Sequence, residues 1–419
     1  MNPLYNAGIH CLSIGARLAS LKSDKIARML KGQQVTAGTL AQKRAEVAPG
    51  GFDIWFHVAS LGEFEQARPM IERIRATQPD KKILLSFFSP SGYEVRHNYD
   101  KVDAVCYLPF DTPRRVKRFI ADAAPKMAIF VKYEFWGNYL TTLKQAGIPV
   151  YIISAIFRPG QRFFKPWGST FRKMLSCYEH IFVQDDASKK LLAADIGLDN
   201  VTAAGDTRFD RVSDIVAHAK DVDEVAAMTN QSAFTLIAGS SWPADEELYI
   251  PWLHSHPDVK AVIAPHEFDR HRVEELADRL GRDNTVILSE LRAKGETAPD
   301  ARYIIIDCFG LLSSIYRYGD VAVIGGGFGN GIHNLNEAAV YDMPVIFGPN
   351  HHKFKEASDL LACGGGFCYD SADGFAHAIE PLYNSKKHLV TAGKAAGDYI
   401  RHSLGATDKI YNFIFKNHD

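Results

Sequence analysis

The sequence of 419 residues lacks the features that define several specialised protein classes. Its six cysteines include no C-x-x-C pair, so neither a disulfide framework nor a zinc ribbon is predicted. No apolar run approaches the roughly 20 residues that a membrane-spanning helix needs. Charge of one sign does not dominate, because 48 Lys and Arg stand against 49 Asp and Glu, a net charge of −1. A dedicated nucleic-acid binder usually carries a basic excess, so nucleic acid is not an expected partner.

The remaining composition is that of a globular protein of two or three domains, with 46% apolar and 23% charged residues. The cysteines suit reduced thiols in a cytoplasmic protein; they are Cys11, Cys106, Cys177, Cys308, Cys363 and Cys368. No His cluster accompanies them, and neither a metal site nor a cofactor is expected. There is no internal repeat and no low-complexity tract.

The N-terminal 50 residues differ from the rest in charge. Residues 1–16 contain no Lys, Arg, Asp or Glu, and residues 1–50 hold seven basic and two acidic residues, a local charge of +5. An apolar segment followed by a basic helix can lie on an anionic membrane surface. A helix docked on the protein with one solvated face explains the same pattern, and both interpretations remain open from this segment.

From residue 53 onward, short apolar runs alternate with stretches of helical periodicity. Phe64, Ala67, Ile71 and Ile74, for example, fall on one helix face. The expected strands are residues 54–58, 83–88, 104–108, 128–131, 150–154, 180–183, 234–238, 259–264, 286–288, 303–306, 321–324, 344–347 and 366–369. Repeated β-α units predict parallel sheets covered by helices on both faces.

The strands fall into two series, and residues 210–232 between them, which hold Val, Ala, Asp and Lys, indicate a domain junction. We therefore expect a membrane-associating segment at 1–50 and two Rossmann-like domains at 51–210 and 211–419, the second closed by C-terminal helices. Two such domains are expected to face each other across a cleft. Ligands of these sheets bind beyond the carboxyl ends of the strands.

Two strand-end motifs carry the strongest chemical signals. Residues 60–63 (Ser-Leu-Gly-Glu) follow the first strand, and Glu63 is either a general base or a helix-start acid favoured by the helix dipole. Residues 325–337 contain five glycines within seven positions after the strand at 321–324. Such a turn followed by a helix lets backbone N–H groups bind a phosphate, and Glu337 can accept from ribose hydroxyls.

Weaker motifs follow other strands. Ser240 and Ser241 precede Pro243 and are expected either to cap a helix or to contact an anion. Glu134, in the segment 132–138, either binds substrate or starts a helix. Residues 205–210 form a polar turn before the domain junction.

Basic and aromatic residues alternate in the segment 156–175, which contains no acid. It holds Arg158, Phe157, Arg162, Phe163, Phe164, Lys165, Trp167, Phe171, Arg172 and Lys173. The mixture suits a phosphate with acyl chains or single-stranded nucleic acid. An amphipathic helix with snorkelling lysines is the alternative.

Taken together, these segments resemble the 3-deoxy-D-manno-octulosonic acid (Kdo) transferases of lipopolysaccharide biosynthesis in Gram-negative bacteria. The resemblance runs from about Trp55 to the last helices. Its most specific blocks are residues 60–69, 108–112, 205–210, 325–337 and 344–353.

The resemblance implies a two-domain GT-B glycosyltransferase at the cytoplasmic face of the inner membrane, peripheral or monotopic. It would transfer Kdo from CMP-Kdo to a lipid A precursor (lipid IVA) with inversion, with Glu63 as general base. Donor-binding residues implied by the matching blocks are Ser240, Ser241, His266, Gly326, Gly327, Gly329, Gly331, Asn334 and Glu337. Acceptor-binding residues would be Glu134, Arg158 and Arg162.

The sequence departs from the family pattern at several blocks. Its Lys-Tyr-Glu-Phe-Trp-Gly-Asn at 132–138 matches the family's acidic-Thr-Glu-Ile-Trp-Pro-Asn only at Glu134, Trp136 and Asn138. The family's Pro-Arg-His-Pro is Ala-Pro-His-Glu at 264–267, which lacks the arginine. The alternative functions are a UDP-sugar glycosyltransferase or epimerase of the same fold, and a non-catalytic nucleotide- or lipid-binding module.

Overall fold

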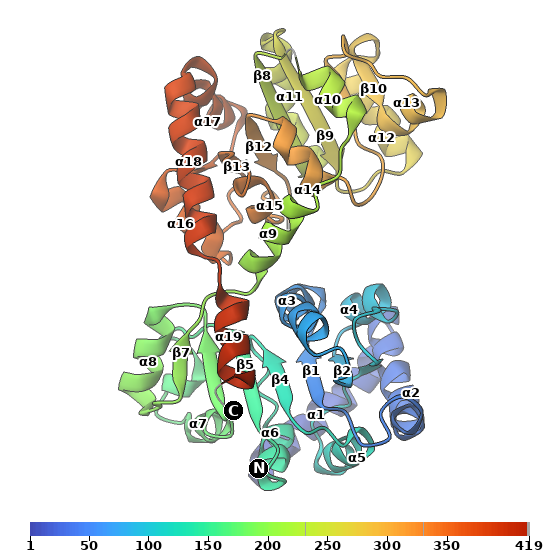
Figure 1. Cartoon of the computed structure of the whole chain (residues 1–419), viewed down its shortest axis with the longest axis vertical. Coiled ribbons are helices and arrows are strands. Elements are labelled where there is room, and N and C mark those ends of the chain that lie inside the picture. Colours follow the sequence, from blue (N-terminus) through green and yellow to red (C-terminus); the bar gives the residue numbers. More distant parts are fainter. Residues whose placement is uncertain (231, 330, 417–419) are drawn as a thin grey trace. The chain divides into compact units, whose positions relative to one another are not determined.

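The structure, a computed structural model, describes residues 1–230, 232–329 and 331–416. The chain divides into two compact units. The first comprises Met1–Asp210 and the C-terminal residues from Gly405, and the second comprises Arg211–Leu404. Each unit holds a seven-stranded parallel sheet with helices on both faces (Figure 1).

The first unit begins with two helices, α1 (Pro3–Ala19) and α2 (Asp24–Val47). Its strands are β1 (Ile54–Val58), β2 (Ile83–Phe87), β3 (Ala104–Tyr107), β4 (Ala128–Val131), β5 (Val150–Ala155), β6 (His180–Val183) and β7 (Val201–Ala203). The helices between them are α3 (Leu61–Thr77), α4 (Pro90–Arg96), α5 (Pro113–Ala123), α6 (Gly137–Gln145), η1 (Arg162–Phe164), α7 (Ser169–Leu175) and α8 (Asp186–Ile196).

The strand order in this sheet is β3-β2-β1-β4-β5-β6-β7. The chain therefore moves outward from β1 to β3 and then returns to place β4 on the other side of β1. Loops that leave β1 and β4 run in opposite directions over the sheet, which creates a topological switch point at the carboxyl ends of these strands.

Helix α9 (Arg208–Ala217) joins the units, and the second unit repeats the same plan. Its strands are β8 (Phe234–Ser241), β9 (Val259–Pro265), β10 (Thr285–Ile287), β11 (Tyr303–Ile305), β12 (Val321–Ile324), β13 (Val345–Phe347) and β14 (Gly366–Cys368). Its helices are α10 (Asp223–Thr229), α11 (Pro243–Ser255), α12 (Arg270–Leu280), η2 (Arg282–Asn284), α13 (Leu288–Lys294), α14 (Leu312–Ile315), η3 (Tyr316–Tyr318), α15 (Asn336–Ala339), α16 (Lys355–Cys363), α17 (Ala372–Asn384) and α18 (Lys386–His402).

The second sheet has the order β10-β11-β9-β8-β12-β13-β14, so its switch point lies between β8 and β12. All strand pairs in both sheets are parallel. The central strands β1, β4, β8 and β12 are almost wholly buried on both faces. Such burial explains their continuous apolar sequences. The fold is thus the predicted pair of Rossmann-like α/β units.

Every predicted strand is present; β1, β4, β6 and β12 have the predicted ends, and the ends of the others are shifted. The short edge strand β7 was not predicted, and its two last residues are only half-buried. Strand β8 extends through Ser241, three residues beyond its predicted end. Strand β10 stops at Ile287 because Leu288 begins helix α13.

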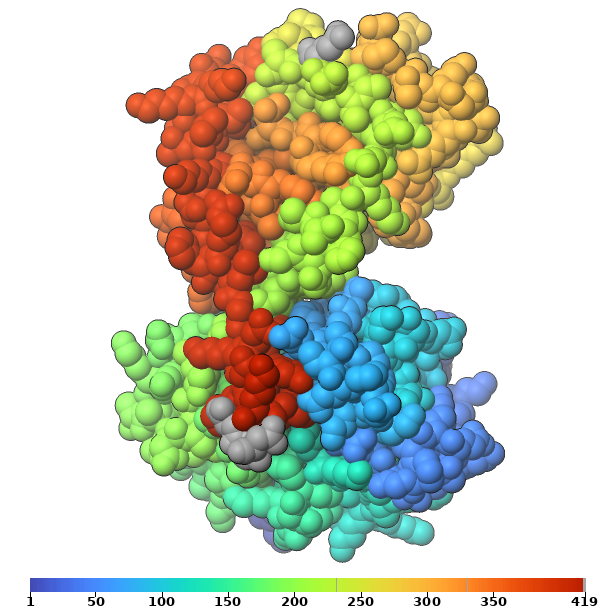
Figure 2. All heavy atoms as spheres, in the orientation of Figure 1, coloured from blue at the N-terminus to red at the C-terminus, as the bar shows by residue number. Residues whose placement is uncertain are grey.

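The prediction that all C-terminal helices close the second domain was wrong for the last of them. Helix α19 (Ala406–Phe415) returns to the first unit, where it packs against α3 (Figure 2). Its Ile410 and Ile414 are buried in the core that contains β1 and α3. The hydroxyl of Tyr411 accepts from Thr77 at 2.8 Å and from Gln78 at 2.7 Å.

Residues 1–50 do not form a domain apart from the first unit. Helix α2 packs against β3 and α5, and its Leu40 is 3% exposed in the main core of the unit. Helix α1 is attached through Tyr5, whose hydroxyl donates to Asp111 at 2.6 Å and accepts from the backbone of Gly137 at 3.0 Å. Among the described residues, no helix is both long and apolar enough to span a bilayer.

Candidate active site

In the first unit, polar side chains gather at the carboxyl ends of β1, β4 and β5. Glu63 follows β1, Tyr133 follows β4 and Arg158 follows β5, and these three strands are neighbours. Burial raises the pKa of Tyr133, and the charges of Arg158 and Glu63 act on its phenol in opposite directions. The three groups are therefore electrostatically coupled beside the switch point, where ligands of such sheets bind.

Glu63 lies in the first turn of α3, three residues after the N-cap Ser60. This spacing matches a capping box, in which the two side chains would bond to each other's backbone N–H groups. The structure shows a different arrangement, because Ser60 makes no side-chain cap bond and its hydroxyl donates to the Glu63 carboxylate. Within the described residues, no ion pair is recorded for Glu63. Its half-exposed carboxylate is thus oriented by one hydroxyl and remains able to accept a proton.

The helix that carries Glu63 is fixed one turn further along by Gln66. The Gln66 amide donates to Asp206 at 3.0 Å, and its backbone carbonyl accepts from the Thr207 hydroxyl at 2.5 Å. The Thr207 hydroxyl also contacts that of Ser154 at 2.9 Å. Ser154 is the second-last residue of β5 and has φ at +52°. Through these contacts, the polar turn at 205–210 fixes the position of the first turns of α3, which carry Glu63.

Asp206 is the charged centre of this turn. Burial by itself would raise the pKa of Asp206, but the Arg208 guanidinium and several hydrogen bonds outweigh it and lower the pKa below its usual value. Arg208 donates to the Asp206 carboxylate at 2.8 Å, and Gln184 donates to the same oxygen at 3.0 Å. Asp206 therefore acts as a buried anion that joins α3, β6 and α9.

The structure argues against substrate binding by Glu134. Its side chain is nearly buried, and Oε2 accepts from Trp136 Nε1 at 2.5 Å and contacts His57 Nε2 at 2.9 Å. The His57 Nδ1 atom in turn contacts Ser86 Oγ at 2.9 Å. Glu134 therefore completes a buried polar network beneath the strand ends, which is neither of the two predicted roles.

Arg158 and Arg162 are exposed, as acceptor-binding residues need to be. The surrounding segment 156–175 is not the amphipathic helix considered above, because it forms η1, a turn and the seven-residue helix α7. Phe157 and Phe163 are buried in the core, and among the segment's aromatic residues only Trp167 is largely exposed. Most of the aromatic side chains in this segment therefore pack in or against the core and are not available to bind a ligand.

In the second unit, β8 ends in Ser240 and Ser241, which differ in accessibility. Ser240 is part-exposed and has φ at +51°, a left-handed conformation that is costly for a residue with a side chain. Ser241 is 3% exposed, and its hydroxyl contacts Tyr249 at 2.9 Å and Glu246 at 3.3 Å. Neither serine caps α11, whose N-cap is Trp242 with Pro243 in the first turn. Ser241 is thus engaged inside the protein, and the prediction that it contacts the donor is not supported.

The glycine-rich segment follows β12 as a loop and not as the start of a long helix. Residues 325–335 are non-helical where described, and Asn330 lies outside the described residues. The next helix, α15, has only four residues. The predicted direct passage from glycine turn to helix was therefore wrong.

Close packing explains four of the glycines in this loop. A Cβ on Gly325 would lie 2.2 Å from the carbonyl oxygen of Ser240, and one on Gly327 would lie 2.5 Å from Gly348 Cα. Gly326 and Gly331 have φ at +92° and +132°, where other residues are strained. A Cβ on Gly329 would meet nothing nearer than 3.7 Å. Among the described glycines of the loop, Gly329 is the one without a steric reason in the protein itself.

Three aromatic side chains stack where β8, β9 and the glycine loop meet. The ring centroids of Trp242 and His266 lie 4.6 Å apart at 24°, and those of His266 and His333 lie 4.4 Å apart at 27°. The Trp242 indole N–H donates to His333 Nε2 at 3.1 Å. Burial, together with the neighbouring His266, lowers the pKa of His333 to about 4. The stack therefore presents planar surfaces beside the loop, with the His333 ring held neutral and the His266 ring exposed.

Glu337 lies near the start of α15, where Asn334 donates to its Oε1 at 2.9 Å. Burial raises the pKa of Glu337, while the nearby Arg211 and the bond from Asn334 act in the opposite direction. Burial also lowers the pKa of Arg211. Arg211 thus supplies a cation near the glycine loop that the sequence analysis did not identify.

Sequence reasoning missed Trp242, His333, Asp206 and Arg211 as organising residues. Trp242 and His333 stood within motifs that were recognised, but the hydrogen bond between them joins residues that are 91 positions apart. Arg211 gave no local signal, because a single arginine in a polar junction is ordinary. Its proximity to Glu337 depends on the path of the chain.

The family model and the curated relatives that match this chain carry the same name. Residues 11–211 match the family described as 3-deoxy-D-manno-octulosonic-acid transferase (kdotransferase). The 3-deoxy-D-manno-octulosonic acid transferase of Haemophilus influenzae is 26% identical over 86% of this chain and 86% of its own. The enzyme of the same name from Aquifex aeolicus is 26% identical over 82% of this chain and 89% of its own.

Among solved structures, UDP-GlcNAc 2-epimerase from Neisseria meningitidis bound to UDP-GlcNAc aligns with a TM-score of 0.60. It is 14% identical, and the alignment covers 87% of this chain and 99% of the epimerase. That likeness establishes the shared two-Rossmann GT-B architecture and nothing about substrate. The matched family region spans the unit that carries Glu63, and the aligned relatives extend into the unit that carries the glycine loop. Residues 11–211 thus match the 3-deoxy-D-manno-octulosonic-acid transferase family of glycosyltransferases, and relatives that carry this name align with most of the chain.

Proposed function

We propose that this protein transfers Kdo from CMP-Kdo to a lipid A precursor of the lipid IVA type, with inversion of the anomeric configuration. The observation that carries the proposal is the placement of Glu63, a carboxylate free of ion pairs among the described residues, beside the switch point of its sheet. The similarity to Kdo transferases supports Kdo as the donor sugar, because the relatives are named for Kdo transfer.

In the proposed reaction, Glu63 accepts the proton of an acceptor sugar hydroxyl. The hydroxyl oxygen forms a bond to the anomeric carbon of Kdo, while the bond from that carbon to the phosphate oxygen breaks and CMP leaves. Attack on the face opposite to the leaving group inverts the configuration. The hydrogen bond from Ser60 orients the carboxylate, so that one oxygen remains to receive the proton.

We propose that the second unit binds CMP-Kdo at the carboxyl ends of β8 and β12. Backbone N–H groups of Gly326, Gly327, Gly329 and Gly331 would stabilise the CMP phosphate as negative charge develops on it. His266 would lie against the nucleotide, and Glu337 with Asn334 would accept the ribose hydroxyls. Ser240 is retained as a donor contact, whereas the buried Ser241 is not.

We propose that the acceptor reaches the first unit from a membrane surface, at the cytoplasmic face of the inner membrane. Helix α1 supports peripheral binding, because Leu4, Leu12 and Leu18 are 84%, 52% and 66% exposed. Exposed apolar side chains on a helix with a basic neighbour are typical of interfacial segments. Arg158 and Arg162 remain the proposed acceptor contacts, and Glu134 is no longer one of them.

The decisive experiment is incubation of the protein with CMP-Kdo and a tetraacylated lipid A precursor, with products identified by mass spectrometry. We expect a product heavier by Kdo and the release of CMP. UDP-GlcNAc offered as the alternative donor should be neither transferred nor epimerised. Turnover of UDP-GlcNAc with no product from CMP-Kdo would replace this proposal by the UDP-sugar alternative.

The assignment of the base is tested by Glu63→Gln, which removes the proton acceptor and keeps the shape. Turnover should fall by more than ~10²-fold, a general-base effect, with unchanged thermal stability. The matched control is Glu65→Gln in the same helix, whose carboxylate pairs with Arg96 at 3.1 Å and does not contact Ser60. Equal turnover in both variants would remove Glu63 from the mechanism.

A further inference from the structure

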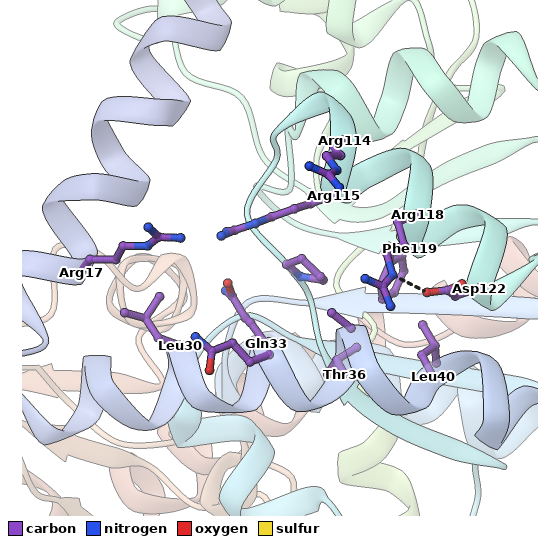
Figure 3. A pocket seen from close by; sticks show the side chains of 13 residues that line it. Arg17, Leu30, Gln33, Thr36, Leu40, Arg114, Arg115, Arg118, Phe119 and Asp122 are labelled. Carbon is purple, nitrogen blue, oxygen red and sulfur yellow. Dashed lines mark ion pairs between the residues drawn. The ribbon is translucent and has the colours of Figure 1, made fainter.

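The first unit contains a cavity that the proposed catalytic residues do not line. It has a volume of about 470 Å³ and lies among α1, α2 and α5 (Figure 3). Its lining residues come from the N-terminal segment and from the helix that follows β3. The lining combines a cluster of guanidinium groups with the apolar side chains of Leu30, Leu40, Pro109 and Phe119.

Four arginines line this cavity against a single acid. Arg118 pairs with that acid, Asp122, at 3.4 Å. For Arg17, Arg114 and Arg115, the described part of the chain records no ion pair with an acid. Arg17 from α1 and Arg115 from α5 extend toward each other across the cavity (Figure 3). Two like charges held in this way repel each other unless an anion lies between them.

Arg115 also shows the electrostatic effect of this arrangement. Burial lowers the pKa of Arg115, and the positive charge of Arg17 lowers it further. The guanidinium is therefore partly removed from water without a carboxylate to compensate its charge. An anionic ligand would provide that compensation, since charge-assisted hydrogen bonds from arginine to phosphate are short and strong.

Gln33 supplies an independent observation in the same cavity. Its side chain is only 5% exposed, yet both Nε2 and Oε1 lack a hydrogen-bond partner. A buried amide without partners is costly and is rare in folded proteins. Gln33 lines the cavity, so a ligand there could accept from its Nε2 atom.

The surroundings distinguish a lipid from a soluble anion. Part of the cavity lining is apolar, and α1 beside it carries Leu12, Ile14 and Leu18, all more than half exposed. A soluble phosphate would gain nothing from this apolar surface. An amphiphile would bury acyl carbon against it while its phosphate reached the arginines.

We propose that this cavity binds the phosphomonoester group of a membrane lipid, held by the guanidinium groups of Arg17, Arg114 and Arg115 and by the amide of Gln33. The phosphomonoester carries more than one negative charge near neutral pH, which matches the uncompensated arginines. Neither Glu63 nor Arg158 lines this cavity, and its occupation requires no donor nucleotide.

The test measures binding of the full chain to vesicles in the absence of CMP-Kdo. Phosphatidylcholine vesicles containing phosphatidic acid are compared with vesicles containing enough phosphatidylglycerol to give the same surface potential. The wild-type protein should bind the phosphomonoester vesicles about tenfold more tightly, and the ratio of the two affinities is the readout. A ratio near one in the wild-type protein would overturn the proposal.

Two triple variants locate the site. Replacing Arg17, Arg114 and Arg115 with Gln should lower the ratio of the two affinities to about one. The control replaces Lys22, Lys25 and Lys117 with Gln; these lysines lie on or beside the same helices but do not line the cavity. The control should weaken binding to both vesicles equally and keep the ratio. Retention of the ratio in the arginine variant, or its loss in the lysine variant, would contradict the assignment.

A single substitution keeps the test independent of folding. Gln33→Leu replaces the unpartnered amide with an apolar group of similar size, so the melting temperature should rise while the affinity ratio falls. In a separate competition experiment, inorganic phosphate at millimolar concentration should lower the ratio of the affinities only slightly, because phosphate lacks the acyl chains. If inorganic phosphate lowers the ratio of the affinities to one, the ligand of the cavity is a soluble anion and not a lipid. An unchanged ratio in Gln33→Leu would remove Gln33 from the site.

Discussion

The carboxylate of Asp245 joins the start of α11 to the glycine loop, because its Oδ2 accepts the backbone N–H of Gly326 at 3.1 Å. The same oxygen accepts the N–H of Trp242 at 3.0 Å. Burial raises the pKa of Asp245, and these two N–H groups act against that effect. One carboxylate therefore holds together the loops that follow β8 and β12, on either side of the switch point of the second sheet.

We predict that Asp245→Ala will loosen the glycine loop and weaken donor binding. Two buried N–H groups would lose their acceptor, at a cost of about 1–3 kcal/mol in the free energy of unfolding. Urea denaturation and calorimetric titration with CMP-Kdo measure the two effects. Glu247→Ala, at an exposed position of the same helix, should change neither. Unchanged donor affinity in Asp245→Ala would show that the loop does not depend on this carboxylate.

Gly327 and Gly329 should respond differently to alanine. A methyl group at Gly327 would collide with the backbone of Gly348, so Gly327→Ala should cost about 1–3 kcal/mol of stability. A methyl group at Gly329 would make only an ordinary contact with the Gly326 carbonyl oxygen at 3.7 Å, so Gly329→Ala should change stability by less than about 0.5 kcal/mol. If Gly329 approaches the donor phosphate, as proposed, its substitution will raise the dissociation constant of CMP-Kdo. Normal donor affinity in Gly329→Ala would leave that glycine without a ligand contact.

Stability of the second unit should fall as the pH drops from 6.5 toward 4. The Trp242 indole can only donate, so His333 Nε2 must keep its lone pair, and the folded protein resists protonation there. The unfolded chain binds this proton below about pH 6.5, whereas the folded chain binds it only near pH 4. The difference amounts to at most about 2 kcal/mol at pH 5.

The variant His333→Gln tests this dependence by chemical denaturation at several pH values. Between pH 6.5 and 4, the free energy of unfolding should decline less steeply for the variant than for the wild-type protein. Above pH 7 the two slopes should coincide, which provides the internal control. Parallel curves throughout would mean that His333 titrates alike in the folded and unfolded states.

Tyr5 should control the attachment of α1 to the rest of the first unit. In Tyr5→Phe, Asp111 loses the donor at 2.6 Å and the N–H of Gly137 loses its acceptor. Hydrogen exchange of the α1 amides should accelerate by about fivefold to about 150-fold, corresponding to a cost of about 1–3 kcal/mol. Exchange in β1 should not change. Leu4→Ala, at a position that is 84% exposed, is the matched control and should leave the exchange of α1 unaltered.

The fold was largely predictable because buried parallel strands produce the same local signal wherever they occur. Strand β12, whose four residues are apolar and wholly buried, was predicted with correct ends. Strand β7 was missed because it lies at the sheet edge and is only partly buried, so its sequence carries no comparable run. Helix α19 was assigned to the wrong unit. An amphipathic pattern indicates that one face of a helix is buried, but it does not indicate in which core that face is buried.

The candidate site was predicted in part, for a related reason. Glycines and carboxylates at strand ends can be found from local order along the chain, and Glu63 and Gly326 were found in this way. Glu134 looked equally suitable, and only the packing of His57 and Trp136 around it shows that its carboxylate lies beneath the strand ends. Whether a polar side chain faces ligand or core depends on contacts that are distant in sequence.

The sequence by itself determined the two parallel α/β units, the strand ends that carry chemistry and the family resemblance, because these follow from local periodicity and ordered motifs. Only the tertiary structure decided which residues meet. It placed Arg17 opposite Arg115, stacked His266 on His333 and withdrew Ser241 into the core. The physical reason is that the energies of charge pairs, ring stacking and buried hydrogen bonds depend on separation in space, which a pattern along the chain does not specify.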